Sequence, residues 1–224
     1  GLAAGVRKRL LAAAVKLAAA AKYRNAGTFE FLVDAVDESD DAEVAFIEAN
    51  ARLQVEHTIT EEITGVDLVE AQLRLAGGET LTSIALTQAD ISEPRGLSMQ
   101  LRVNLETMTA DGTAKPSGGV LSAYEAPSGA GVRVDGYGYT GYRTSPAFDS
   151  LLAKVIVTAA SGQLGDVAAR ANRALAEFRI IGAATNISFL QALLKHPGFL
   201  SGQIYTRFVD EEVGALVTAA DGPQ

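Results

Sequence analysis

Polar and apolar residues alternate strictly between positions 48 and 56 of the sequence. Because successive side chains of an extended chain point to opposite faces, one face would present a carboxylate, an amide, a guanidinium, an amide and a carboxylate in a row. Alternation alone usually indicates a half-solvated strand without a site. Glutamate, asparagine and glutamine are poor strand formers, however, so a chemical site is the open alternative. The five polar residues are Glu48, Asn50, Arg52, Gln54 and Glu56.

The segment before this one brings a further carboxylate close to Glu48. Residues 28–34 alternate and are β-prone, residues 35–43 are strongly acidic, and residues 44–48 return as a second strand, which predicts a hairpin. Glu30 can then lie beside Glu48, and two close carboxylates repel each other unless a cation sits between them. The chain has no cysteine and only two histidines, so Mg²⁺ or Mn²⁺ suits the site best. The alternative is a pair of solvated carboxylates that never touch.

Hydrophobic periodicity predicts the elements that must position these side chains. Residues 2–22 have helical spacing, and Asp67 begins another helix that Gly77 and Gly78 close. In the second half of the chain, glycine-rich turns separate short strands and two helices follow. The residues after Val217 are small and polar, which predicts a frayed end. The strands predicted in the second half are 98–105, 119–125, 131–136 and 152–158, and the helices are 164–178 and 186–194.

Two stretches of the sequence closely resemble the biotin carboxylases, the components that carboxylate biotin in acetyl-CoA, propionyl-CoA, long-chain acyl-CoA and pyruvate carboxylases. The first stretch, AGTFEFLVD followed by FIEANARLQVEHTITEEITGVDLVEAQLRLAGG, is similar to the second half of their ATP-grasp domain. The second stretch resembles their C-terminal domain through LRVNLET, KPSGGVLSAYEAPSGAGVRVD, YTGYRTSPAFDSLLAKVIV and IIGAATNISFL. The run RLQVEH is especially specific to this family. Carbamoyl phosphate synthetases share the paired acidic residues but lack RLQVEH.

The resemblance implies an α+β fold in two domains. Residues 1–90 would be the C-terminal part of an ATP-grasp domain, an antiparallel sheet with helices. Residues 91–224 would be a biotin carboxylase C-terminal domain with short strands and helices. Nothing in the sequence resembles the family's N-terminal domain, its glycine-rich lid over ATP or its phosphate-binding lysines. The first residue is Gly1 rather than Met, so we expect a piece of a longer enzyme that is inactive by itself.

The same resemblance implies roles for residues at the nucleotide. Glu30, Glu48 and Asn50 match the metal-binding positions that hold the phosphates of ATP. Leu32 matches a wall of the adenine pocket, which agrees with its place on the same face of the strand as Glu30. Glu56 matches the general base that deprotonates bicarbonate.

Further positions match the sites for bicarbonate, for biotin and for a second copy of the chain. Arg52, Gln54 and the backbone N–H of Val55 resemble the cradle that binds bicarbonate. Arg102, in QLRVN, matches the arginine that steadies the biotin enolate, although an ordinary surface arginine of a strand is the alternative. Arg133, in GVRVD, matches a position at the family's dimer interface.

The implied function is the ATP-dependent carboxylation of biotin with bicarbonate through carboxyphosphate. The implied partners are a biotin carboxyl carrier domain, a carboxyltransferase component and a second copy of the chain, and we expect an acyl-CoA as the final acceptor. Two other functions stay open: a non-catalytic scaffold or dimerisation module, and a different ATP-grasp ligase. Turnover of ATP would distinguish an enzyme from a scaffold. Stimulation of that turnover by biotin would distinguish a biotin carboxylase from another ATP-grasp ligase.

Composition excludes several other classes of protein. The chain has 224 residues, of which 48% are hydrophobic and 21% charged, as in a soluble globular protein. A net charge of −8 argues against a broad nucleic-acid surface. No apolar run reaches the roughly 20 residues of a membrane span, so we expect a cytoplasmic protein without a membrane partner. The basic, acid-free segment before Glu30 leaves an organellar transit peptide as an alternative.

Overall fold

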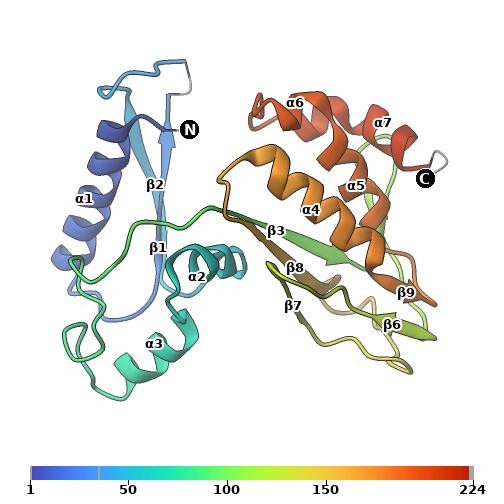
Figure 1. Ribbon diagram of the computed structural model, residues 1–224, viewed down its shortest axis with the longest axis horizontal. Helices are drawn as coiled ribbons and strands as arrows, with labels where there is room; N and C mark the ends of the chain where they lie inside the picture. Colours follow the sequence, from blue (N-terminus) through green and yellow to red (C-terminus); the bar gives the residue numbers. More distant parts are fainter. Residues whose placement is uncertain (1, 35, 222–224) are drawn as a thin grey trace. The chain divides into compact units, whose positions relative to one another are not determined.

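The computed structural model of the chain describes residues 2–34 and 36–221 (Figure 1). They form two compact units of mixed helix and antiparallel strand, as expected for an α+β fold. The short helix Thr58–Thr64 belongs to the second unit, which the predicted domains 1–90 and 91–224 did not anticipate. That domain division stays a prediction. The first unit consists of Gly1–His57 and Gly65–Ser92, and the second of Thr58–Thr64 and Glu93–Gln224.

The first unit combines the predicted hairpin with helices. Its two strands, β1 and β2, pair antiparallel. Helix α3 begins where the sequence predicted, because the side chain of Asp67 accepts a hydrogen bond of 2.8 Å from the backbone N–H of Glu70. It ends at Ala76, directly before Gly77. The elements are α1 Ala4–Ala20, β1 Thr28–Val33, β2 Val44–Asn50, the 3₁₀ helix η1 Val55–His57 and α3 Leu68–Ala76.

A β-bulge in the hairpin decides which side chains of β2 face which side. Glu30 pairs with Glu48, but Phe31 pairs with Phe46, so Ile47 is the extra residue. In a regular strand Phe46 and Glu48 would share a face. The bulge separates them: Phe46 packs edge-on against Phe31, with ring centroids 5.7 Å apart, while Glu48 lies on the polar face beside Glu30.

The second unit is built on a three-stranded antiparallel sheet with the order β3-β8-β7. Alternate residues of its strands, among them Val103, Val155 and Val157, are fully buried against helix α4, which runs alongside the sheet in Figure 1. Burial of each such side chain stabilises the fold by about 1.5–3 kcal/mol. The other face of the sheet carries polar residues and helix α2. The elements are α2 Thr58–Thr64, β3 Leu97–Asn104, β7 Val132–Gly136, β8 Leu151–Ala159 and α4 Leu164–Glu177.

The remaining elements of the second unit are short strands and the C-terminal helices. The strand predicted at 119–125 is wrong in its first half, because only Ala123–Glu125 forms a strand. The predicted fraying after Val217 is also wrong as far as Ala220, since a helix continues to that residue, and residues 222–224 lie outside the described chain. The elements are β4 Glu106–Met108, β5 Ala114–Pro116, β6 Ala123–Glu125, β9 Arg179–Ile181, α5 Ile187–Lys195, α6 Pro197–Leu200 and α7 Phe208–Ala220.

The helices carry one further finding about the described chain. Within residues 2–34 and 36–221, none of them combines the length and the apolar character needed to cross a membrane.

Candidate active site

The hairpin of the first unit brings the three predicted metal ligands together. Glu30 and Glu48 are directly opposite each other in the antiparallel ladder. The side-chain amide of Asn50 lies between them, and its nitrogen donates hydrogen bonds of 2.8 Å to Glu30 Oε1 and 2.9 Å to Glu48 Oε1. The arrangement predicted from the alternating sequence, two carboxylates beside an amide, is therefore present.

A second amide reaches the same cluster from beyond the strand. The side-chain nitrogen of Gln54 donates a hydrogen bond of 3.0 Å to Glu30 Oε1, the atom that Asn50 also contacts. The resemblance predicts Gln54 as a bicarbonate ligand, and that role stays a prediction; in the structure its amide contacts Glu30. Two amide donors on one oxygen balance part of the negative charge that Glu30 and Glu48 bring together.

The extended segment expected from residue 48 to residue 56 is wrong beyond Asn50. Strand β2 ends there, the chain bends at Arg52, and η1 begins at Val55. Alternation of polar and apolar residues does not distinguish one long strand from a short strand followed by a turn, because the same short sequence is compatible with both structures. Arg52, Gln54 and Glu56 therefore do not continue the polar face of the strand.

The residues predicted to bind and deprotonate bicarbonate lie in this bend and in η1. Arg52 is exposed, with Nη1 3.5 Å from the carbonyl oxygen of Leu53. Val55 is 37% exposed, and Glu56 is the middle residue of η1. A contact that the sequence did not indicate fixes the end of η1: His57 Nε2 lies 2.9 Å from Thr28 Oγ1 at the start of β1. The bend and the hairpin are thereby joined within one unit.

The donor set fits Mg²⁺ or a similar hard cation. Such cations prefer carboxylate and amide oxygens and commonly bind through one or two carboxylates plus nucleotide phosphates. The orientation of an asparagine amide follows from its hydrogen bonds, and turning the amide of Asn50 over would direct its oxygen toward Glu30 and Glu48. In the described residues no cluster contains three or more histidine, cysteine, aspartate or glutamate residues suited to a metal. A cation held here would need further ligands, such as water molecules or phosphate oxygens.

Leu32 lies near this cluster on the face where the sequence placed it. It is two residues after Glu30 in β1 and pairs with Ala45 of β2. Its side chain is 62% exposed, which is unusual for leucine and suits a surface that a flat apolar ligand covers.

The second unit contains the other two predicted site residues. Arg102 of β3 is exposed and pairs with Lys154 of β8, which in turn pairs with Asp135 of β7. Directly opposite residues in an antiparallel sheet share a face, so these three side chains form one row across it. Arg133 lies two residues before Asp135 on the same face of β7.

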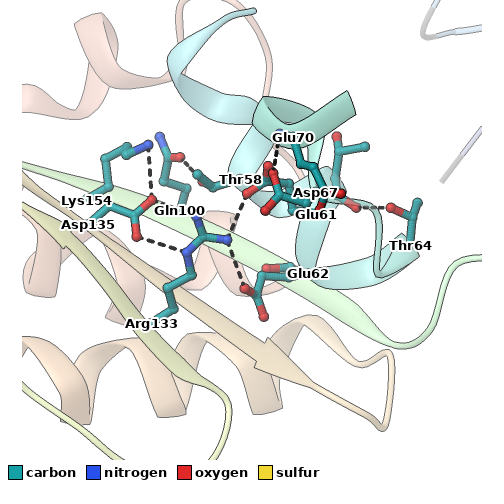
Figure 2. Close-up of polar contacts among 12 residues, drawn as sticks. Thr58, Glu61, Glu62, Thr64, Asp67, Glu70, Gln100, Arg133, Asp135 and Lys154 are labelled. Carbon is teal, nitrogen blue, oxygen red and sulfur yellow. Dashed lines mark hydrogen bonds and ion pairs between the residues drawn. The ribbon is translucent and has the colours of Figure 1, made fainter. Parts of the chain in front are cut away.

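Arg133 is the centre of an ion-pair network (Figure 2). Its guanidinium donates to both carboxylate oxygens of Asp135, at 2.9 and 2.8 Å. Its Nη1 donates to Glu61 at 2.8 Å and to Glu62 at 3.3 Å, both on α2. Arg133, and at 3.4 Å the ammonium group of Lys154, hold the pKa of Asp135 below its ordinary value.

Two protein families match the chain in succession. The family described as "Carbamoyl-phosphate synthase L chain, ATP binding domain" matches residues 1–84. The family described as "Biotin carboxylase C-terminal domain" matches residues 100–211, which is half of the chain.

Known sequences are similar over nearly the whole chain. Pyruvate carboxylase of Aspergillus niger is 46% identical over 227 residues, an alignment that spans 100% of this chain and 18% of that protein. The mitochondrial pyruvate carboxylase of Homo sapiens is 44% identical over 208 residues, and the alignment spans 92% of this chain and 17% of that protein. The chain thus corresponds to well under half the length of either relative.

Solved structures are similar in the same region. The biotin carboxylase domain of a single-chain bacterial carboxylase superimposes with a TM-score of 0.88 at 46% identity, over 98% of this chain and 48% of that one. A single-chain, multi-domain long-chain acyl-CoA carboxylase gives a TM-score of 0.91 at 42% identity, over 100% of this chain and 23% of that one. The biotin carboxylase domain of the Hydrogenobacter thermophilus 2-oxoglutarate carboxylase, solved with MgADP and bicarbonate, gives 0.85 at 36% identity, over 100% and 46%.

Proposed function

Since the chain belongs to the biotin carboxylase family, whose C-terminal domain matches half of its residues, we propose that it supplies part of an active site for ATP-dependent carboxylation of biotin. The observation that carries this proposal is the cluster of Glu30, Glu48 and Asn50 on one face of the hairpin. Its oxygen donors suit the magnesium ion of Mg·ATP, and a related biotin carboxylase domain was solved with MgADP. Mn²⁺ suits the same ligands.

In this proposal the chain's residues divide the work between nucleotide, bicarbonate and biotin. Mg·ATP supplies the phosphoryl group that activates bicarbonate. Glu56 removes the proton of bicarbonate, and the planar guanidinium of Arg52 holds the anion through paired hydrogen bonds, with Val55 adding its backbone N–H. For Gln54 to bind bicarbonate as well, its amide must leave Glu30 and donate its hydrogen bond to the anion.

Arg102 has a later role in the same proposal. A guanidinium stabilises negative charge where that charge develops, here on the ureido oxygen of biotin during attack on CO₂. Arg102 is an exposed residue of strand β3, where it pairs with Lys154 of β8.

The similar proteins do not agree on the final acceptor of the carboxyl group. The similar sequences described above are pyruvate carboxylases, whereas the similar structures include carboxylases of a long-chain acyl-CoA and of 2-oxoglutarate. These similarities therefore do not favour an acyl-CoA acceptor over a 2-oxo acid. A carrier domain, a carboxyltransferase component, dimerisation and a cytoplasmic location are further parts of the proposal.

The test measures ATP cleavage by the full-length protein that contains these residues, with and without bicarbonate and free biotin. A biotin carboxylase releases phosphate only with bicarbonate, releases it faster with biotin, and forms carboxybiotin. Cleavage that biotin does not affect would indicate another ATP-grasp ligase. No cleavage under any condition would indicate a scaffold and refute the proposal.

A further inference from the structure

Asn186 is a buried polar residue directly before helix α5 in the second unit. Asparagine at this position of a helix usually accepts a hydrogen bond from a backbone N–H of the first turn. The side chain of Asn186 forms no such cap, although it is only 8% exposed. A buried amide needs hydrogen-bond partners, so its partners must lie in another part of the fold.

The amide of Asn186 binds the backbone of strand β3. Its nitrogen donates a hydrogen bond of 3.1 Å to the carbonyl oxygen of Arg102, and its oxygen accepts one of 2.9 Å from the backbone N–H of Asn104. The backbone N–H of Asn186 adds a hydrogen bond of 3.1 Å to the carbonyl oxygen of Asn104. Because the amide joins one backbone acceptor and one backbone donor, only one of its two orientations satisfies both. It therefore takes the place of the peptide group of a neighbouring strand.

The contact lies on the edge of β3 that faces away from β8. β3 is an end strand in the order β3-β8-β7, so the sheet pairs with only one of its edges (Figure 1). The pairing with β8 also becomes irregular at this point, because Val103 pairs with Ala153 but Asn104 pairs with Leu151. Asn186 thus holds β3 at the place where the regular ladder ends.

This contact fixes the backbone of a residue to which the proposed function gives a role. The carbonyl group of Arg102 is one of the two backbone groups that the amide of Asn186 binds. The side-chain rotamers open to a residue depend on its backbone torsion angles. A misplacement of about 1 Å at a reacting centre lowers a rate on the order of 10²-fold. Loss of the amide of Asn186 should therefore displace the guanidinium of Arg102 far enough to affect its chemistry.

We propose that Asn186 is a positioning residue for Arg102. Its amide fixes the backbone of β3 at Arg102 and Asn104, and so holds the guanidinium where negative charge develops on the ureido oxygen of biotin. This inference rests on the proposed function. Asn186, Arg102 and Asn104 all belong to the second unit, so the whole device lies within that unit.

The experiment measures the ratio of phosphate released to biotin carboxylated by the full-length protein. Asn186→Ala removes both side-chain contacts with β3. Asn186→Asp keeps an acceptor for the N–H of Asn104 but removes the donor to Arg102. Ser117→Ala is the control, because the hydroxyl of Ser117 donates a hydrogen bond of 2.7 Å to the carbonyl oxygen of Ala184. That change removes a hydrogen bond from the segment before α5 and leaves the contacts of Asn186 in place.

We expect the ratio to rise about tenfold in Asn186→Ala and in Asn186→Asp, because a displaced guanidinium stabilises the charge on biotin less after CO₂ has formed. A loss of folded protein would lower both activities together and leave their ratio unchanged. Combining Asn186→Ala with Arg102→Ala should raise the ratio no further than Arg102→Ala does, because both changes remove the same interaction with biotin. Ser117→Ala should leave the ratio unchanged.

An unchanged ratio in either variant of Asn186 would overturn the proposal, because both variants lose the contact with Arg102. If the unmodified protein carboxylates biotin, the proposed function stands in that case. An equal rise in Ser117→Ala would also overturn it, since any disturbance of the segment before α5 would then be sufficient. A further rise in the combined protein would show that Asn186 acts independently of Arg102. If the unmodified protein forms no carboxybiotin, the proposed function fails, and the positioning role fails with it.

Discussion

Asn50 is the residue that makes two neighbouring glutamates compatible. Its amide nitrogen contacts one oxygen of Glu30 and one of Glu48, so its N–H groups occupy the place of a cation between them. Sequence alternation was sufficient to predict Glu48 and Asn50 on one face of β2, whereas the place of Glu30 beside Glu48 depended on the register of the hairpin. It could not predict that Gln54 also contacts Glu30, because that contact depends on the bend after β2.

A charge change at either glutamate should weaken the metal site selectively. In the full-length protein, Glu30→Gln or Glu48→Gln removes one negative charge, and we expect the Mg²⁺ concentration for half-maximal ATP cleavage to rise on the order of 10–100-fold. Glu43→Gln is the control, because Glu43 is exposed in the same hairpin and carries the same charge. A Mg²⁺ dependence that is the same in all three variants would rule out the metal assignment.

At the scale of elements, the sequence predicted those with strong local signals. The predicted helices and long strands of the second half lie within two residues of α4, α5, β3, β7 and β8. The bulge at Ile47 could not be predicted, because it depends on the packing of Phe46 against Phe31 rather than on any local preference. Helix α2 was also missed, since contacts from β3 and β7 stabilise it and its own length does not.

The start of α3 allows a direct test of a locally encoded element. Asp67→Ala removes the acceptor for the N–H of Glu70 and should lower the free energy of unfolding by about 1 kcal/mol. Asp67→Asn keeps an acceptor oxygen and should change it by only a few tenths of a kcal/mol. Urea unfolding of the two variants gives the comparison. Equal losses in both would mean that the cap does not stabilise α3.

The ion pairs between β7 and α2 should make the free energy of unfolding depend on pH in the acidic range. Arg133 and Lys154 lower the pKa of Asp135 in the folded chain below its unfolded value of about 3.9. Asp135 therefore contributes stability above about pH 4, and the contribution disappears as the pH falls through the lowered pKa. Asp135→Asn lacks this contribution at every pH. The stability difference between the two proteins, measured by urea unfolding, should shrink from pH 7 toward pH 2, and a constant difference would contradict the assignment.

At the scale of the whole molecule, the proposed function assigns residues of both units to successive steps of one reaction. Glu56 belongs to the first unit and Arg102 to the second. Both residues could be identified from the sequence, because each lies within a short distinctive run. The division of the chain could not, since α2 belongs to the second unit although it directly follows η1. The carboxyl acceptor also has no signature among these 224 residues.

The central claim is that both units take part in the carboxylation of biotin, and the ratio of phosphate released to biotin carboxylated tests it most directly. In the full-length protein, Glu56→Gln should reduce both activities together, by on the order of 10²–10⁴, because bicarbonate is no longer deprotonated. Arg102→Ala should reduce carboxybiotin on the order of 10²–10³ while bicarbonate-dependent ATP cleavage largely survives, because its charge is needed only after CO₂ forms. The account therefore predicts a raised ratio in Arg102→Ala alone. An equal loss of both activities in the two variants would contradict it.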